Sequence, residues 1–303
     1  MNDDRIHKII QLKKEKNAVI MAHYYVPDEI QQIADAIGDS FYLAKAARSS
    51  DADIIVFCGV SFMGESAKIL CPDKKVLMPD MTADCPMAHM VADGRIAEMR
   101  EQYEDLAVVC YINSTAALKC QSDVCVTSSN AVQIVRDLPN RNIFFIPDRN
   151  LGRYVAEQVP EKNIILNDGC CPIHDTISAE EVRQEKERHP HALVLAHPEC
   201  GDEILALSDY IGSTAGIIAC AKKSTADEFI ICTEDGVGYR LRQDNPDKRF
   251  YFPKTRPCCP DMKLNTIEKV LRVLETEENE VFVDEALRAN ALPPLDRMLE
   301  NAK

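Results

Sequence analysis

The feature that most constrains the fold of this chain is a set of three regularly spaced cysteines, each followed by proline. Cys85, Cys171 and Cys259 are separated by 86 and then 88 residues. A further Cys-Pro pair, Cys71-Pro72, lies outside this period, so the spacing carries more information than the dipeptide. Equal spacing predicts one structural unit that occurs three times and supplies a cysteine from the same place each time. Three such units around a pseudo-threefold axis would bring the three sulfurs to one point.

Polar residues at the ends of predicted strands recur with the same period. In each third of the chain, such a residue precedes a serine at the start of a predicted helix, by 17, 15 and 16 residues. The three pairs are His23 with Ser40, Asn113 with Ser128, and His197 with Ser213. A serine in this place is an ordinary N-cap. A helix N-terminus with a hydroxyl is also suited to bind a carboxylate or phosphate group, and Thr214 adds a donor beside Ser213.

Short apolar runs alternate with amphipathic runs, which predicts parallel sheets joined by right-handed helical crossovers. The predicted strands are 17–23, 53–58, 75–78, 106–111, 123–127, 142–146, 163–166, 193–196, 228–232 and 249–252. The principal predicted helices are 4–16, 27–37, 41–48, 63–70, 87–103, 131–138, 151–159, 178–189, 215–222, 238–243, 264–274 and 283–301. Ser178 and Glu181 are expected to form a capping box.

The predicted fold class is therefore α/β, with three pseudo-threefold-related αβα units and short parallel sheets around a central cavity. The expected units are residues 1–85, 86–171 and 172–261, and the helices of 262–303 are expected to pack back on the body. Ligands of such sheets bind beyond the carboxyl ends of the strands, where the polar residues and the cysteines lie in this sequence.

Composition narrows the possible functions. The net charge of −14 over 303 residues argues against a nucleic-acid or anionic-membrane surface. No run of eighteen apolar residues is present, and the N-terminal stretch lacks the features of a signal peptide. We therefore expect a cytoplasmic protein whose cysteines bind metal or act in catalysis instead of forming disulfides.

Three thiolates at one point suit an iron–sulfur cluster that keeps one iron without a protein ligand. That iron can act as a Lewis acid on a substrate. Zinc is the alternative metal, with His89 or His174 as a fourth ligand. Packing cysteines are a further alternative, and most of Cys58, Cys110, Cys125, Cys200, Cys220 and Cys232 are interpreted in that way.

A small set of strand-end side chains can carry acid–base chemistry. Glu199 is the one carboxylate in the selected set of strand-end residues, so it is the first candidate for a general acid or base. Tyr25 and Tyr111 either pack or relay protons. His23 and His197 are either core histidines or ligands of a substrate.

Several motifs of this chain together resemble the quinolinate synthase family. They are Ala22-His23-Tyr24-Tyr25, Asp39-Ser40, residues 53–59, Tyr111-Ile-Asn-Ser-Thr115, Val126-Thr-Ser-Ser-Asn130, His197-Pro-Glu-Cys200, Ser213-Thr214 and Cys259-Pro-Asp-Met262. The resemblance covers essentially the whole length. It departs from the family's usual pattern at the paired cysteines 170–171 and 258–259, and at Tyr24.

The resemblance implies condensation of iminosuccinate with dihydroxyacetone phosphate to quinolinate, with release of phosphate and two waters. It implies a [4Fe-4S] cluster held by Cys85, Cys171 and Cys259, whose fourth iron binds substrate. An L-aspartate oxidase or dehydrogenase is the implied source of iminosuccinate. Another cluster-dependent hydro-lyase, or a non-enzymatic iron–sulfur sensor, remains an alternative.

The resemblance also implies roles for individual residues. Tyr25 and Glu199 are implied to move protons, assisted by Tyr111 and His174. The implied substrate-binding residues are His23, Ser40, Tyr111, Ile112, Asn113, Ser128, His197, Pro198, Glu199, Ser213 and Thr214.

Overall fold

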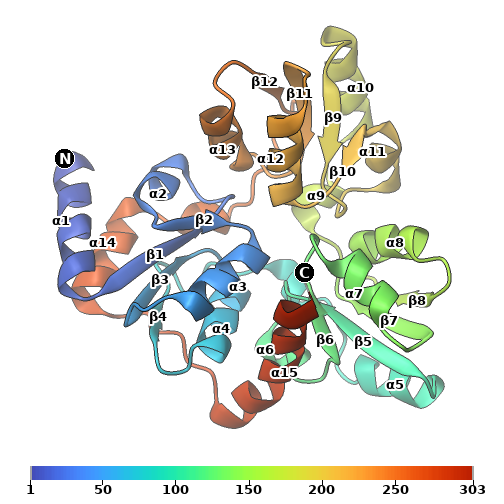
Figure 1. Cartoon of the computed structure of the whole chain (residues 1–303), viewed down its shortest axis with the longest axis horizontal. Coiled ribbons are helices and arrows are strands. Elements are labelled where there is room, and N and C mark those ends of the chain that lie inside the picture. Colours follow the sequence, from blue (N-terminus) through green and yellow to red (C-terminus); the bar gives the residue numbers. More distant parts are fainter. Residues whose placement is uncertain (1, 302–303) are drawn as a thin grey trace. The chain divides into compact units, whose positions relative to one another are not determined.

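The computed structural model describes residues 2–301 and confirms an α/β fold with three four-stranded sheets (Figure 1). The first sheet has the order β2 (Ala36–Gly38), β1 (Ala18–His23), β3 (Ile54–Cys58) and β4 (Lys75–Leu77). The second has the order β6 (Val124–Val126), β5 (Leu106–Tyr111), β7 (Asn142–Ile146) and β8 (Asn163–Leu166). The third has the order β10 (Tyr210–Ile211), β9 (Leu193–Ala196), β11 (Glu228–Cys232) and β12 (Arg249–Tyr251).

The strand order, taken along the chain within each sheet, is second, first, third, fourth in all three cases. The central pairs are parallel, for example β1 with β3, in which Ala18 pairs with Ile54 and Ala22 with Cys58. Most residues of these central strands are buried, as expected for sheets covered on both faces. Because the order reverses between the first and third strands, the carboxyl ends of this pair form the expected ligand-binding place in each sheet.

Helices connect the strands. They are α1 (Asn2–Glu15), α2 (Asp28–Ile33), α3 (Ser40–Ser49), α4 (Ser61–Leu70), α5 (Arg95–Gln102), α6 (Ala116–Lys119), α7 (Ala131–Asp137), α8 (Arg149–Gln158), α9 (Pro172–Asp175), α10 (Ala179–Arg188), α11 (Asp202–Leu207), α12 (Thr214–Lys223), α13 (Val237–Asp244), α14 (Ile267–Thr276) and α15 (Glu285–Asn301). Short 3₁₀ helices cover Pro86–His89 and Met262–Leu264.

The chain divides into two compact units. The first comprises residues 2–89, 112–125 and 260–301, and the second comprises residues 90–111 and 126–259. The first unit therefore contains the first sheet together with α6, α14 and α15, while the third sheet and most of the second belong to the second unit. The division into repeats at residues 85, 171 and 261 stays a prediction.

In the first unit, α1 and α14 pack side by side over the first sheet, and α3 and α4 pack together (Figure 1). The C-terminal helix α15 contacts α4 and α6. Arg48 of α3 pairs with Asp296 of α15, which adds a polar contact to this packing. The two C-terminal helices thus belong to the same body as the N-terminal sheet.

In the second unit, the core of the third sheet is formed by Val182 of α10, Ile204 of α11 and strand residues such as Val194 and Ile230. Ser178 caps α10 by accepting the Glu181 N–H, which is half of the predicted capping box. The Glu181 carboxylate instead accepts the N–H and hydroxyl of Thr255. The reciprocal half of the box was therefore predicted wrongly.

Several other local predictions were wrong. The helix predicted over 27–37 ends at Ile33, and Ala36–Gly38 forms the edge strand β2. The helix predicted over 87–103 is interrupted, because Gly94 has a φ of 79° and α5 begins only at Arg95. Asp39, and not Ser40, caps α3 by accepting the Tyr42 N–H. The short helices α6, α9 and α11 were not predicted.

No helix within residues 2–301 combines the length and the apolar character that crossing a membrane requires. All thirteen cysteines lie in the described part of the chain, and none forms a disulfide there.

Candidate active site and metal site

The three period-defining cysteines occupy corresponding positions in the three repeats. Each lies in the loop after the fourth strand of its sheet. In every repeat, a backbone N–H at the end of the loop after the third strand donates to the carbonyl oxygen two residues before the cysteine. These bonds join Ser61 N to Ala83 O at 2.9 Å, Arg149 N to Gly169 O at 2.7 Å, and Asp235 N to Pro257 O at 2.8 Å. By this hydrogen-bond register Cys85, Cys171 and Cys259 occupy equivalent positions. Cys170 and Cys258 each lie one residue before that position.

Burial separates these cysteines from most of the others. Cys85, Cys171 and Cys259 are half-buried. The fully buried strand and loop cysteines are Cys58, Cys110, Cys125, Cys200 and Cys232, with 0 % exposure, and they pack as predicted. Cys220 is half-buried. Burial raises the pKa of the Cys58 thiol and raises that of Cys232 to about 12, so these two thiols are held in the neutral form.

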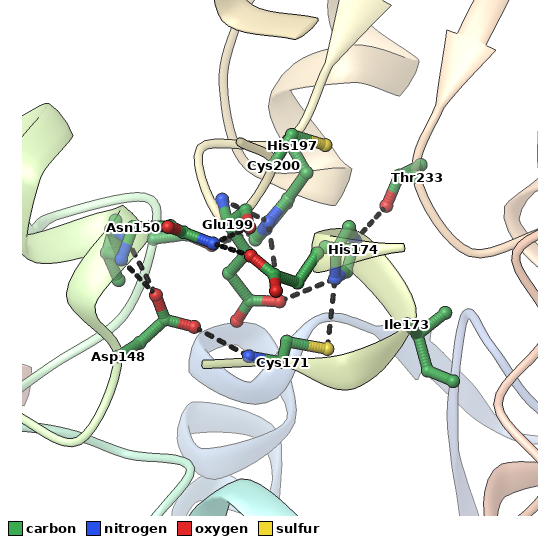
Figure 2. Close-up of polar contacts among 12 residues, drawn as sticks. Asp148, Asn150, Cys171, Ile173, His174, His197, Glu199, Cys200 and Thr233 are labelled. Carbon is green, nitrogen blue, oxygen red and sulfur yellow. Dashed lines mark hydrogen bonds and ion pairs between the residues drawn. The ribbon is translucent and has the colours of Figure 1, made fainter. Parts of the chain in front are cut away.

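A buried histidine–carboxylate pair lies beside Cys171 in the second unit (Figure 2). The short helix α9 starts with Pro172 directly after Cys171, and one turn later it places His174 Nδ1 3.2 Å from Cys171 Sγ. The same Nδ1 atom lies 2.7 Å from Glu199 Oε2. The ligand atoms of Cys171, His174 and Glu199 lie within 4.8 Å of one another, which makes this trio able to hold a metal ion.

The loop after β9 supplies a second histidine to the same place. His197 stacks on His174 with ring centroids 4.7 Å apart. Its Nδ1 atom accepts the Glu199 N–H at 3.3 Å, and its Nε2 atom lies 3.1 Å from Ser128 Oγ. The structure therefore brings the predicted residues Ser128, His174, His197 and Glu199 together, and Pro198 lies in the same loop.

The other polar atoms of this group are fixed by residues that follow neighbouring strands. Thr233 Oγ1, just beyond β11, lies 2.8 Å from His174 Nε2. Asn150 of α8 donates from Nδ2 to the Glu199 carbonyl oxygen at 2.9 Å (Figure 2). Among residues 2–301, Glu199 Oε1 is buried without a partner at normal hydrogen-bond geometry. That oxygen is therefore available to a ligand.

The electrostatics of this group favour an ionised Glu199. Burial alone would raise the pKa of Glu199, but electrostatic interactions with His174 and His197 and hydrogen bonds from His174 and Tyr111 lower it to about 2. Burial lowers the pKa of His197 to about 3, so this imidazole is neutral near pH 7. Because its Nδ1 accepts an N–H, His197 carries its proton on Nε2 and donates it to Ser128.

A second buried carboxylate, Asp148, lies at the N-terminus of α8. Its side chain is fully buried and accepts the N–H groups of Asn150 and Leu151. Burial, together with the negative charge of Glu199, raises the pKa of Asp148 well above its ordinary value. The accepted N–H groups, including that of Cys171, act in the opposite direction and favour the ionised form. Asp148 was not among the site residues predicted from the sequence.

The first unit contains the predicted residues His23, Tyr25, Ser40, Ile112 and Asn113. His23 ends β1, is 6 % exposed and packs its ring against that of Tyr25, with centroids 4.5 Å apart. Its Nδ1 atom accepts the Tyr25 N–H at 3.2 Å. Ser40 is the first residue of α3 and lines a small cavity together with Ile112. Asn113 has a buried Oδ1 atom that lacks a hydrogen-bond partner in the described part of the chain.

A buried lysine supports the Asn113 loop and was not anticipated. Lys119 is 0 % exposed; its ammonium group donates to the Ser114 carbonyl oxygen and lies 5.5 Å from the centre of the Phe62 ring. A lysine in an apolar run carries no sequence signal for such a role.

In the second unit, Ser213 caps α12 by accepting the Gly216 N–H, and Thr214 is the buried first residue of that helix.

Comparison with known proteins adds independent information. The family model described as "Quinolinate synthetase A protein" matches residues 7–300. The chain is 53% identical to quinolinate synthase from Fusobacterium nucleatum subsp. nucleatum over 299 residues, which is 99% of each chain. It is 50% identical to quinolinate synthase from Clostridioides difficile (strain 630) over 298 residues, which is 98% of each chain. The relative from Caldicellulosiruptor saccharolyticus, of the same name, is 52% identical over 293 residues, which is 97% of each chain.

Proposed function

Because the chain belongs to the quinolinate synthetase A family, we propose that it is a quinolinate synthase. The reaction condenses iminosuccinate with dihydroxyacetone phosphate and yields quinolinate, one phosphate and two waters. Family matches over nearly the full length, at about half identity, support an activity of this type.

The observation that carries the proposal is the buried Glu199 with its ring of donors. Condensation and ring closure require protons to leave carbon and nitrogen, and the two dehydrations require protons to reach departing hydroxyl groups. Ionised Glu199 and His174 form a buried pair with one open carboxylate oxygen, and the pair is positioned to exchange protons with a bound substrate. The hydroxyl of Tyr111 is suited to return them.

We propose that Cys85, Cys171 and Cys259 hold a [4Fe-4S] cluster. Their corresponding positions and half-buried thiols fit this donor set. When bound, such a cluster offers one iron without protein ligand as a Lewis acid toward oxygen or nitrogen atoms of a substrate. Burial and the charge of Asp175 raise the pKa of Cys170, which disfavours this neighbouring thiol as a ligand.

The remaining predicted residues are proposed to bind and orient the substrates. Hydroxyl and amide groups suit carboxylate and phosphate oxygens, and a helix N-terminus adds N–H donors to Ser40, Ser213 and Thr214. Tyr25, Tyr111, Glu199 and His174 are proposed to move protons. The full proposed substrate-binding set is His23, Ser40, Tyr111, Ile112, Asn113, Ser128, His197, Pro198, Glu199, Ser213 and Thr214.

The supply of iminosuccinate and the location of the protein follow from the same proposal. Iminosuccinate is an unstable imine, so we propose an L-aspartate oxidase or dehydrogenase as the partner that produces it. We propose a cytoplasmic location because the [4Fe-4S] cluster needs a reducing environment.

The test is an anaerobic assay of quinolinate with iminosuccinate generated in situ and dihydroxyacetone phosphate added. We expect equal amounts of quinolinate and phosphate, and none when either substrate is omitted. Dehydration of a simple hydroxy acid without use of dihydroxyacetone phosphate would instead identify a hydro-lyase.

A further inference from the structure

Each of the three corresponding cysteines donates its backbone N–H to a carboxylate. Cys85 N donates to Asp84 Oδ1 at 2.7 Å, Cys171 N to Asp148 Oδ2 at 3.2 Å, and Cys259 N to Glu234 Oε1 at 3.0 Å. Figure 2 shows the bond from Cys171 to Asp148. The same contact in all three repeats indicates a shared requirement of the three cysteine loops.

The second contact of each carboxylate is also shared. Asp148 Oδ1 accepts the N–H groups of Asn150 and Leu151 at the start of α8, at 2.8 and 2.9 Å. Glu234 Oε2 accepts the N–H of Gly236, the N-cap of α13, at 2.7 Å. Asp84 Oδ1 accepts the hydroxyl of Ser61, the first residue of α4. Every carboxylate therefore joins the cysteine to the helix that follows the third strand.

The position in the sequence that supplies the carboxylate differs between the first repeat and the other two, but the contact is present in all three. Asp148 and Glu234 each lie two residues after the third strand of their sheet. The corresponding residue of the first repeat is Val60, which cannot accept a hydrogen bond from its side chain. There the carboxylate comes from Asp84, next to the cysteine itself. The chain thus keeps the contact although the position that supplies it has changed.

Two of these carboxylates are buried and the third is partly exposed. Asp148 is 0 % exposed and Glu234 is 1 % exposed, whereas the Asp84 side chain is 43 % exposed and also contacts His89 Nε2 at 2.7 Å. A hydrogen bond from which water is excluded is screened less, and meets less competition from solvent, than an exposed one. Water therefore competes less for the cysteine N–H groups that Asp148 and Glu234 accept than for the one that Asp84 accepts.

We propose that Asp84, Asp148 and Glu234 are positioning residues for a metal cluster, each fixing the backbone of one cysteine ligand against the start of a helix. This inference rests on the proposed function, because it assumes that the three cysteines hold the cluster. Groups that orient the ligands of a metal site typically change its affinity about tenfold to 100-fold. An ionised carboxylate also adds negative charge near the site, and net charge helps to set the reduction potential of a cluster.

The test replaces each carboxylate by its amide, as Asp148→Asn, Glu234→Gln and Asp84→Asn. An amide has one acceptor oxygen, so in the first two variants the new side chain can accept from the helix or from the cysteine but not both. The matched control is Asp284→Asn. Asp284 accepts the N–H groups of Ala286 and Leu287 at the start of α15, and it lies beyond the last cysteine in the sequence.

Two properties of the anaerobically purified holoprotein are measured, namely the rate of iron release to a chelator and the reduction potential of the cluster. We expect Asp148→Asn and Glu234→Gln to release iron about tenfold faster than the parent. We expect a smaller change of the release rate for Asp84→Asn, a more positive potential for Glu234→Gln and Asp84→Asn, and neither change for Asp284→Asn. A purely structural role would lower the melting temperature without moving the potential.

The outcomes separate this inference from the proposed function. Parent protein with iron and sulfide, together with unchanged release rates and potentials in all three variants, overturns the positioning role alone. Parent protein without iron and sulfide overturns the cluster proposal, and the positioning role with it. If Asp148→Asn fails to fold, Glu234→Gln and the half-exposed Asp84→Asn decide the question.

Discussion

The Nδ1 atom of His174 lies 2.7 Å from the Oε2 atom of Glu199, and both side chains are at most 3 % exposed. Removing one member of such a buried pair leaves the other without compensation, which destabilises a protein more than replacing both. The contact therefore links the stability of this part of the second unit to the group proposed to move protons.

Glu199→Gln tests the proposed proton acceptor. Glutamine keeps the size and a hydrogen-bonding oxygen but cannot take up a proton, so we expect kcat to fall about 10²- to 10⁴-fold. The measurement is anaerobic quinolinate formation at saturating substrate. Glu203→Gln is the control, because Glu203 lies four residues further on and its side chain is 77 % exposed. Equal turnover of Glu199→Gln and the parent would refute the assignment.

The low pKa of His197 predicts that the folded protein loses stability in mild acid. Its pKa falls to about 3 in the folded protein, from an ordinary value of 6.5, mainly through burial. Between these two values the unfolded chain binds the additional proton, so stability decreases as the pH falls below about 6.5. One proton corresponds to a slope of about 1.4 kcal/mol per pH unit. The group faces Glu199 and His174, and protonation of Nδ1 removes its bond with the Glu199 N–H.

Urea unfolding at about pH 7 and about pH 5, on either side of the ordinary histidine pKa, measures this slope. We expect His197→Gln to reduce the difference between the two conditions, while His189→Gln, at a half-buried histidine that stacks on Tyr251, preserves it. Comparing variants cancels the acid sensitivity that all forms share. The same slope in His197→Gln and the parent would show that His197 is not the group responsible.

The architecture could be predicted because the same sequence features recur in each third of the chain. The cysteine period indicated three copies, and the apolar runs located the principal strands. The wrong predictions concerned individual helices and strands. The strand Ala36–Gly38 has three residues and follows a helix-like run, so hydrophobic periodicity could not detect it. Gly94 could have indicated the break before α5, since its left-handed backbone ends the preceding turn there.

Within the candidate site, residues at strand ends were predictable because polar groups are unusual there. Ser128, His174, His197 and Glu199 do meet in the second unit. Asp148 carried a readable signal that was missed, since an acidic residue follows the third strand by two positions in two repeats. Lys119 could not have been predicted, because its hydrogen bond to Ser114 is to a backbone carbonyl, which any residue type offers.

The ion pairs of Glu277 with Lys16 and Lys75 in the first unit are expected to be lost in acid. Hydrogen bonds from Lys16 and Lys75 lower the pKa of Glu277 to about 2. A depressed carboxyl pKa stabilises the fold above about pH 4.5, and this contribution is lost as the pH falls toward 2. Ion pairs with this much exposure contribute about 0.2–1 kcal/mol. We expect Glu277→Gln to lower the melting temperature slightly at neutral pH.

Salt and pH provide the control for this effect. The difference between Glu277→Gln and the parent should shrink in high salt and vanish near pH 2, because screening and protonation both remove the pair. Glu285→Gln is the matched variant, since Glu285 pairs with Arg288 of its own helix. A difference that persists in high salt would point to packing, not charge.

The central claim is that Cys85, Cys171 and Cys259 hold one cluster, and its most direct test is iron and sulfide per chain after anaerobic purification. The paired cysteines supply the control within the chain. The account predicts about four of each for the parent, for Cys170→Ser and for Cys258→Ser, with loss in Cys85→Ser, Cys171→Ser and Cys259→Ser. Bound zinc without sulfide, or full iron in Cys171→Ser together with loss in Cys170→Ser, would contradict it.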